Sequence, residues 1–157
     1  MACFFRWMLG YGHDALPNFM KLIVAGSRSI TRYTDVRQGI IDSGFWHLHK
    51  SRLEIVSGMA QGVDLLGVEF AKRNGLKWHE MPAAWDDLNA PNCRIKYNRY
   101  GKPYNANAGF DRNISMGKFS DGLCAIWDGK SGGTKQMIDW SYANGLDVHV
   151  HIVGGKK

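Results

Sequence analysis

Two segments of this sequence combine glycine with hydroxyl-bearing and charged side chains in a way that suits phosphate binding. The first is Gly26-Ser27-Arg28, and the second comprises Asp128, Ser131, Gly132, Gly133 and Thr134. Each follows a short apolar run and precedes a helical pattern. Backbone N–H groups at the start of a helix lack partners within it and carry a partial positive charge. The two segments therefore predict a site for a phosphorylated ligand.

A third segment, Gly58-Met59-Ala60-Gln61-Gly62-Val63-Asp64, has a related pattern. It lacks the Gly-x-Gly-x-x-Gly of a dinucleotide-binding loop and the Gly-Lys-Ser/Thr of a P-loop. We expect Gly58, Gly62 and Asp64 to contribute to the same site. For Asp64 two roles stay open: a cap of the following helix, or a partner of a ribose hydroxyl.

Arg112 and Asn113 open a predicted helix, and Trp85 opens a long polar segment. The arginine either reaches the phosphate site or lies on a solvated helix end. The tryptophan either stacks on a base or packs in the protein. His149 and His151 share one face of a predicted strand, but no further ligand has metal-site spacing relative to them. We therefore predict no metal and no cofactor.

Strands and helices alternate along the chain, which indicates βαβ units and a parallel sheet. We predict strands at 22–25, 53–56, 77–81, 123–127 and 147–153. Helices are predicted from Thr31 or Thr34 to about residue 47, and at 63–74, 110–118 and 133–144. Residues 85–109 are expected to form a polar loop. The fold class is α/β, a Rossmann-like three-layer sandwich with a mostly parallel five-stranded sheet in the order 3-2-1-4-5.

That strand order supports the proposed site independently of the glycine pattern. It places a switch in strand order between the first and fourth strands, and ligands bind at such switch points beyond the carboxyl ends of the strands. The first two glycine-bearing segments follow these two strands.

Length and composition fit one domain. The chain has 157 residues, and we assign 20–157 to a single domain with 1–19 as an extension outside it. No apolar stretch is long enough to cross a membrane. The net charge of +6 favours phosphorylated or polyanionic partners. Three widely spaced cysteines fit a reducing cytoplasm, and no tight run of Lys and Arg marks a nucleic-acid-binding segment.

Taken in order, several motifs resemble the YspA/YpsA-related branch of the SLOG superfamily, the group of Rossmann-like domains around the SMF/DprA and LOG proteins. They are Ala25 to Arg28, Val56 to Asp64, Pro82 to Trp85, Ala108 to Asn113 and Ile126 to Lys135, and the resemblance covers residues 20 to about 153. It implies a domain that binds nucleotides or nucleotide-derived signals, often in phage or prokaryotic conflict systems. Met59 departs from the pattern, where this branch usually has a second glycine.

The resemblance also bears on catalysis. The LOG relatives cleave the bond between a base and ribose 5′-monophosphate, and Arg112, Gly133 and Thr134 match their pattern. Met137 stands where those hydrolases have a glutamate that stabilises the sugar cation. Asp128 is a candidate replacement, and Asp139 is a poorer one because it lies on another face of the helix.

Three functions remain, in order of preference. The first is a non-catalytic sensor or sequestering protein for a nucleotide-derived small molecule. The second is a nucleotide N-glycoside hydrolase, and the third is a nucleic-acid-binding accessory protein. We also expect a cytoplasmic homo-oligomer, most simply a dimer, without membrane association.

Overall fold

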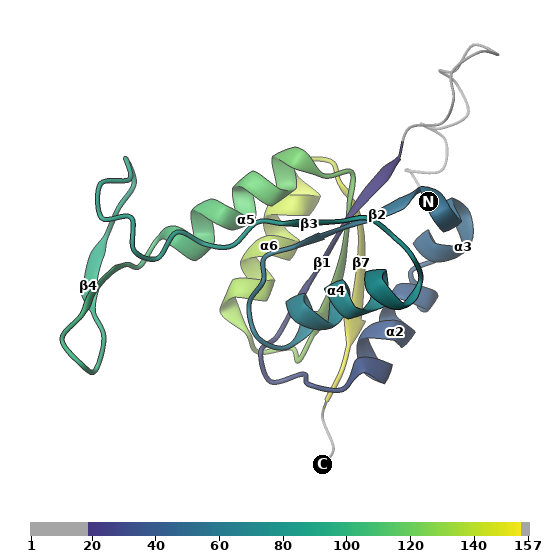
Figure 1. The fold of residues 1–157 in the computed structure, drawn as a ribbon, viewed down its shortest axis with the longest axis horizontal. Coiled ribbons are helices and arrows are strands. Elements are labelled where there is room, and N and C mark those ends of the chain that lie inside the picture. Colours follow the sequence, from purple (N-terminus) through teal and green to yellow (C-terminus); the bar gives the residue numbers. More distant parts are fainter. Residues whose placement is uncertain (1–18, 155–157) are drawn as a thin grey trace, which may run out of the picture.

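Five parallel strands form the central sheet of the protein, seen here in a computed structural model that describes residues 19–154. They are β1 (Met20–Gly26), β2 (Leu53–Ser57), β3 (Trp78–Glu80), β6 (Gly122–Trp127) and β7 (Asp147–Ile152). Their order is β3-β2-β1-β6-β7 (Figure 1), and β6 and β7 are the fourth and fifth strands of this sheet along the chain. The predicted α/β class and strand order are therefore confirmed.

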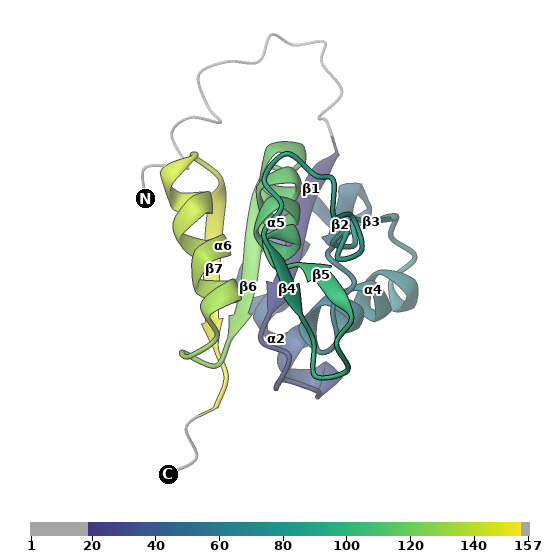
Figure 2. The ribbon, with the colours of Figure 1, turned by 90° about the vertical axis from the view of Figure 1, so that its left-hand side faces the viewer.

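Helices cover both faces of this sheet and complete the three layers (Figures 1 and 2). One face packs against α2 (Tyr33–Asp42), α3 (Phe45–His49) and α4 (Val63–Arg73). The other packs against α5 (Ala108–Phe119) and α6 (Gly132–Ala143). Successive side chains of a strand point to opposite faces, so Leu22 and Val24 join the first core and Ile23 and Ala25 the second.

The single helix predicted up to residue 47 is wrong, because the chain forms two helices there. α2 ends at Asp42, and Gly44, with φ +80°, precedes α3. A positive φ suits glycine and interrupts a right-handed helix. Neither Thr31 nor Thr34 is the N-cap of α2, since Arg32 occupies that position without a capping side-chain bond. A short 3-10 turn, η1 (Lys50–Arg52), then leads into β2.

The segment 85–109, expected as a loop, contains an antiparallel hairpin. Its strands are β4 (Ile95–Tyr97) and β5 (Pro103–Asn105), which form a sheet of their own. Figure 1 shows this hairpin extending away from the sandwich at the left of the view.

Within residues 19–154, no helix has the length and apolar character needed to span a membrane. The predicted N-terminal extension, 1–19, lies outside the described residues except for Phe19.

Candidate functional site

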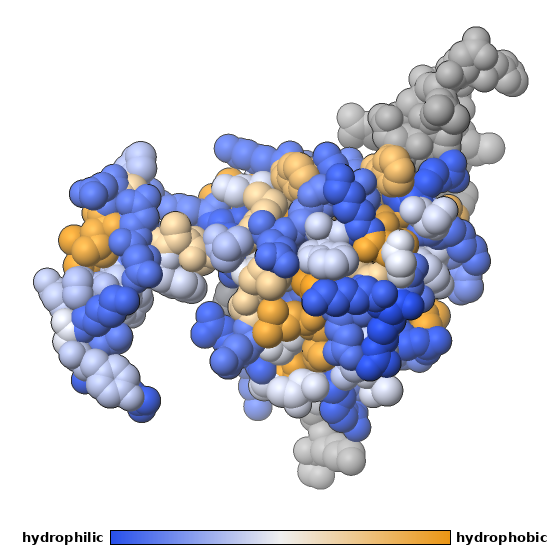
Figure 3. All heavy atoms as spheres, in the orientation of Figure 1, coloured by the Kyte–Doolittle hydropathy of each residue, from blue (hydrophilic) through white to orange (hydrophobic). Residues whose placement is uncertain are grey.

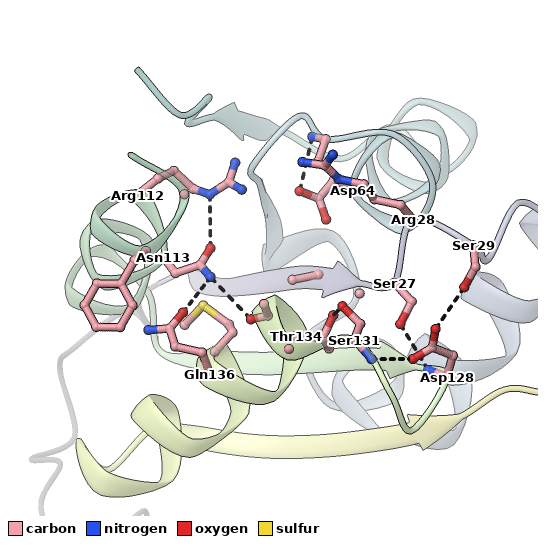
Figure 4. Close-up of a pocket in the computed structure, with 18 of the residues that line it drawn as sticks. Ser27, Arg28, Ser29, Asp64, Arg112, Asn113, Asp128, Ser131, Thr134 and Gln136 are labelled. Atoms are coloured by element: carbon pink, nitrogen blue, oxygen red, sulfur yellow. Dashed lines mark hydrogen bonds between the residues drawn. The ribbon is translucent and has the colours of Figure 1, made fainter. Parts of the chain in front are cut away.

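A cavity of about 640 Å³ lies beyond the carboxyl ends of β1 and β6 (Figure 4). Its walls come from the loops after these strands, the first turns of α5 and α6, the start of α4 with the loop before it, and the chain between β3 and α5. This is the place where strand order switches, because β1 leads outward to β2 and β6 outward to β7. Its volume is in the range of ligand sites, about 300–1,000 Å³.

Most of the predicted site residues meet at this cavity. Its lining includes Gly26, Ser27, Arg28, Asp64, Trp85, Arg112, Asn113, Asp128, Ser131, Gly132, Gly133 and Thr134. Gly58 and Gly62 do not line it. The lining also includes residues that were not predicted to belong to the site: Ala25, Ser29, Ala60, Ala106, Gly109, Phe110, Gln136 and Met137.

Gly26 and Ser27 join the loops after β1 and β6. A Cβ atom at Gly26 would overlap the carbonyl oxygen of Ile126 and crowd Val63. The backbone N–H of Ser27 donates to the carbonyl of Ile126 (3.1 Å), and its Oγ accepts the N–H of Asp128 (3.1 Å). Ser27 is only 1% exposed, so its hydroxyl mainly holds the two loops together.

The Asp128 carboxylate organises the loop between β6 and α6. Its Oδ1 accepts the N–H groups of Lys130 and Ser131, both at 2.8 Å, and its Oδ2 accepts the Ser29 hydroxyl at 3.0 Å. The N–H groups of Ser131 and Lys130 lower the pKa of Asp128 to about 2. A carboxylate held in this way stays ionised, and it fixes the loop between β6 and α6 to the loop after β1 (Figure 4).

The N-terminus of α6 is open toward the cavity. Ser131 is its N-cap, and a Cβ atom at Gly132 or Gly133 would meet no atom within 4 Å. The first N–H groups of a helix have no acceptor within the helix. The Thr134 hydroxyl caps none of these N–H groups, because its Oγ1 donates to Ser131 Oγ at 3.2 Å. This helix start therefore presents free donors and space for a ligand atom.

Asp64 and Arg112 lie together at the side of the cavity nearest β2. Asp64 is 5% exposed, and its Oδ2 accepts the N–H of Ala60 at 3.2 Å. Burial raises the pKa of Asp64 to about 6, against the opposing effect of the Arg112 charge. Arg112 also donates through Nη1 to the carbonyl of Gly58. A Cβ atom at Gly58 would overlap both side chains, so this glycine gives them room.

Arg112 also bonds to its neighbour Asn113 on α5, and Asn113 connects α5 to α6. Arg112 Nε donates to Asn113 Oδ1 (3.0 Å), and Asn113 Nδ2 donates to Gln136 Oε1 (2.8 Å). Gln136 lies on α6 one turn beyond Gly132, a spacing that places both on one side of the helix. That spacing is the signal in the sequence that would have identified Gln136.

Arg28 differs from Arg112 in being exposed, with no hydrogen bond to any residue between 19 and 154. Gly62, the N-cap of α4, has φ +85° and lies close against the backbone of Arg28. It therefore positions the loop that carries this arginine. Met59, which replaces the glycine of the resemblance, has φ +59°.

Two aromatic side chains form the outer part of the cavity wall. Trp85 is 38% exposed and Phe110 is 48% exposed. The Trp85 ring lies against Gly109 and makes an edge contact with Tyr104, with ring centroids 6.4 Å apart. Trp85 therefore packs on the chain and also borders the cavity, and base stacking on it stays a prediction.

Comparisons with known proteins extend the fold assignment. No protein-family model and no curated protein matches this sequence. Among solved structures, DNA processing protein A (DprA) from Streptococcus pneumoniae matches with a TM-score of 0.58 and 20% sequence identity. The match covers 88% of this chain and 52% of DprA, so the chain spans about half the length of that protein. The chain therefore has a DprA-like Rossmann fold; the narrower YspA/YpsA-related assignment stays a prediction.

Proposed function

We propose that the cavity binds a phosphorylated, nucleotide-derived small molecule without hydrolysing it. The observation that carries the proposal is the open N-terminus of α6, where Gly132 and Gly133 leave free N–H groups and unfilled space. Arg28 and Arg112 line the same cavity and supply positive charge. A phosphate bound between them would gain charge-assisted hydrogen bonds.

The aromatic wall favours a nucleotide over a simple phosphate ester. Trp85 and Phe110 offer partly exposed rings in the same cavity as the phosphate donors. A base can pack on such a ring, since aromatic faces interact favourably with other flat ring systems. One molecule with a phosphate and a base would use both kinds of wall.

The surroundings of Met137 support binding without hydrolysis. Met137 is 1% exposed and lines the cavity from α6, and its thioether can neither transfer a proton nor offset a sugar cation. Asp139 also lies on α6, but it forms an ion pair with Lys135 at the exposed surface, with Nζ and Oδ2 2.5 Å apart. Asp128 braces its own loop through both carboxylate oxygens.

A second candidate function, N-glycoside hydrolysis, rests on Asp64. Its carboxyl group lines the cavity, and burial brings its pKa to about 6, near the value that suits a general acid at neutral pH. Incubation with nucleoside monophosphates and ADP-ribose, followed by chromatography for free base, separates the two functions. Turnover that disappears in Asp64→Asn but persists in Asp128→Asn would establish the hydrolase.

Isothermal calorimetry with nucleoside 5′-monophosphates and ADP-ribose tests binding directly. We expect Arg28→Ala to weaken the tightest of these ligands by about 1.5–3 kcal/mol, the range for hydrogen bonds to charged groups. Because Arg28 is exposed, this change should leave the fold intact. Arg37→Ala, which changes another exposed arginine, on α2, is the matched control. Unchanged affinity in Arg28→Ala, or no binding by any ligand of the panel, would refute the proposal.

The proposed setting is a cytoplasmic prokaryotic or phage protein that senses or sequesters its ligand, and a homodimer is the expected assembly. Sedimentation of the full chain checks the assembly. Mass spectrometry of small molecules released from the denatured protein checks whether a ligand is retained during purification.

A further inference from the structure

The β4–β5 hairpin with its flanking residues forms a unit apart from the cavity, which we call the hairpin arm (residues 94–105). Figure 1 shows it standing away from the sandwich. Every residue of β4 is exposed, and so are residues 98–102 of the connecting turn. The exposed part of the arm therefore adds almost nothing to either hydrophobic core.

Side-chain amides give the hairpin arm a defined shape. At its tip, Asn98 Oδ1 accepts the N–H groups of Tyr100 (2.9 Å) and Lys102 (3.0 Å). At its base, Asn105 is 1% exposed, and its Oδ1 accepts the N–H groups of Arg94 (3.2 Å) and Asn107 (3.0 Å). These bonds fix both ends of the hairpin without a hydrophobic core, so its surface is already ordered for a partner.

The hairpin arm is uniformly basic. Residues 88–110 contain four cationic side chains and no acidic one, the cations being Arg94, Lys96, Arg99 and Lys102. Only Lys102 has an ion-pair partner in the described chain, Asp86, with Nζ and Oδ1 3.3 Å apart. No contiguous Lys/Arg run marks the segment, because the cations are separated by one or two other residues. Lys96 lies on β4, Arg94 just before it, and Arg99 and Lys102 in the exposed turn that follows.

Exposed aromatic rings accompany these cations. Tyr97 is 69% exposed and Tyr100 78%, and the Arg99 guanidinium lies 4.8 Å from the Tyr100 ring centroid. Tyr97 pairs across the hairpin with Pro103, whereas Lys96 pairs with Tyr104. Both faces of the hairpin therefore carry a ring, and Figure 3 shows hydrophobic and hydrophilic surface side by side on it.

We propose that the hairpin arm is a binding surface for single-stranded nucleic acid. Proteins that bind unpaired strands combine cations that track the phosphates with aromatic rings on which bases stack. Base faces are accessible in an unpaired strand, which favours it over a duplex. A second copy of this chain would bring a like-charged arm, and like charges repel. This function is separate from ligand binding in the cavity.

Fluorescence anisotropy with labelled oligo-dT and oligo-U of about 16 nucleotides tests the proposal on the full chain. We expect the double variant Tyr97→Ala/Tyr100→Ala to bind at least about 5-fold more weakly, from lost stacking. The triple variant Arg94→Ala/Lys96→Ala/Arg99→Ala should lower the steepness of the log–log salt dependence by about 2, because each phosphate contact on a single strand contributes about 0.7.

The matched control removes the same charge elsewhere. Arg37→Ala/Arg52→Ala/Lys77→Ala changes three exposed cations that lie outside the hairpin arm, and we expect it to retain most of the affinity. Equal weakening by the control, or no binding by the wild type at low salt, would overturn the proposal. A tyrosine variant that dissociates a dimer while binding oligonucleotide normally would also overturn it, because the arm would then be a subunit contact.

Discussion

Gly26, at the end of β1, and the Gly132-Gly133 pair, at the start of α6, border the same cavity but differ in what surrounds them. A Cβ atom at Gly26 would overlap the backbone of Ile126, whereas one at Gly132 or Gly133 would meet open space. Similar sequence patterns therefore have different causes. Packing between two loops accounts for the first glycine, whereas no neighbouring atom accounts for the other two, which the proposed ligand would approach.

Replacing Gly26 by alanine gives the largest expected effect of this comparison. The new methyl group would force β1 and β6 apart where Ser27 N–H bonds to Ile126. Overpacking of this kind costs about 1–3 kcal/mol and occasionally more, and we expect a loss of about 3 kcal/mol or more in the free energy of unfolding. Urea denaturation measures it, and a loss below 1 kcal/mol would show that the two loops separate easily.

Asp64, the last residue of the third glycine-bearing segment, should make stability depend on pH. Its pKa is about 6 in the folded protein and about 3.9 in an unfolded chain. The folded state therefore binds more protons between these values, and stability falls as pH rises from about 4 to about 6. The loss amounts to about 2–3 kcal/mol.

The variant Asp64→Asn isolates this effect. Its stability relative to the wild type should increase by that amount between pH 4 and pH 7.5, as followed by urea denaturation at both values. A difference between the two proteins that does not change with pH would mean that Asp64 titrates normally.

Met59 provides the reverse case, a residue with a side chain where the backbone favours glycine. Its φ of +59° lies in the left-handed region, which costs an ordinary residue roughly 1–2 kcal/mol. Because glycine also gains freedom in the unfolded chain, we expect Met59→Gly to raise stability by only about 0.5–1 kcal/mol. A lower melting temperature would show that the Met59 side chain makes compensating contacts.

The sandwich and the hairpin arm also differ in how well the sequence predicted them. Buried strands such as Leu22–Ala25 and Leu123–Trp127 appear as apolar runs, so their strands and the order of the sheet were predictable. The hairpin arm was not predictable, because β4 has no buried face. Its sequence therefore lacks the apolar pattern that identifies a strand. Its register depends on Asn98 and Asn105 side chains, which leave no periodic pattern.

The residues of the cavity, too, could be predicted from the sequence only in part. The segments that follow β1 and β6 converge by topology, and Gly26 and Thr134 line one cavity with Arg112 of α5. Gly58 and Gly62 are also glycines, but they do not line the cavity. Gly58 lies against Arg112, and Gly62 lies against the backbone of Arg28. Ala106, between β5 and α5, and Phe110, in the first turn of α5, line the cavity through the path that the chain takes after β5. Local sequence does not specify that path.

Two measurements on Gly132→Ala/Gly133→Ala test phosphate binding at the N-terminus of α6 most directly. Alanine is the better helix former by up to about 1 kcal/mol per residue, and both positions are open, so the free energy of unfolding should hold or rise. Calorimetry with the tightest nucleotide ligand should show at least tenfold weaker binding, because the methyl groups occupy the space at the helix start. Wild-type affinity in this stable variant would contradict the claim that the N-terminus of α6 holds the phosphate.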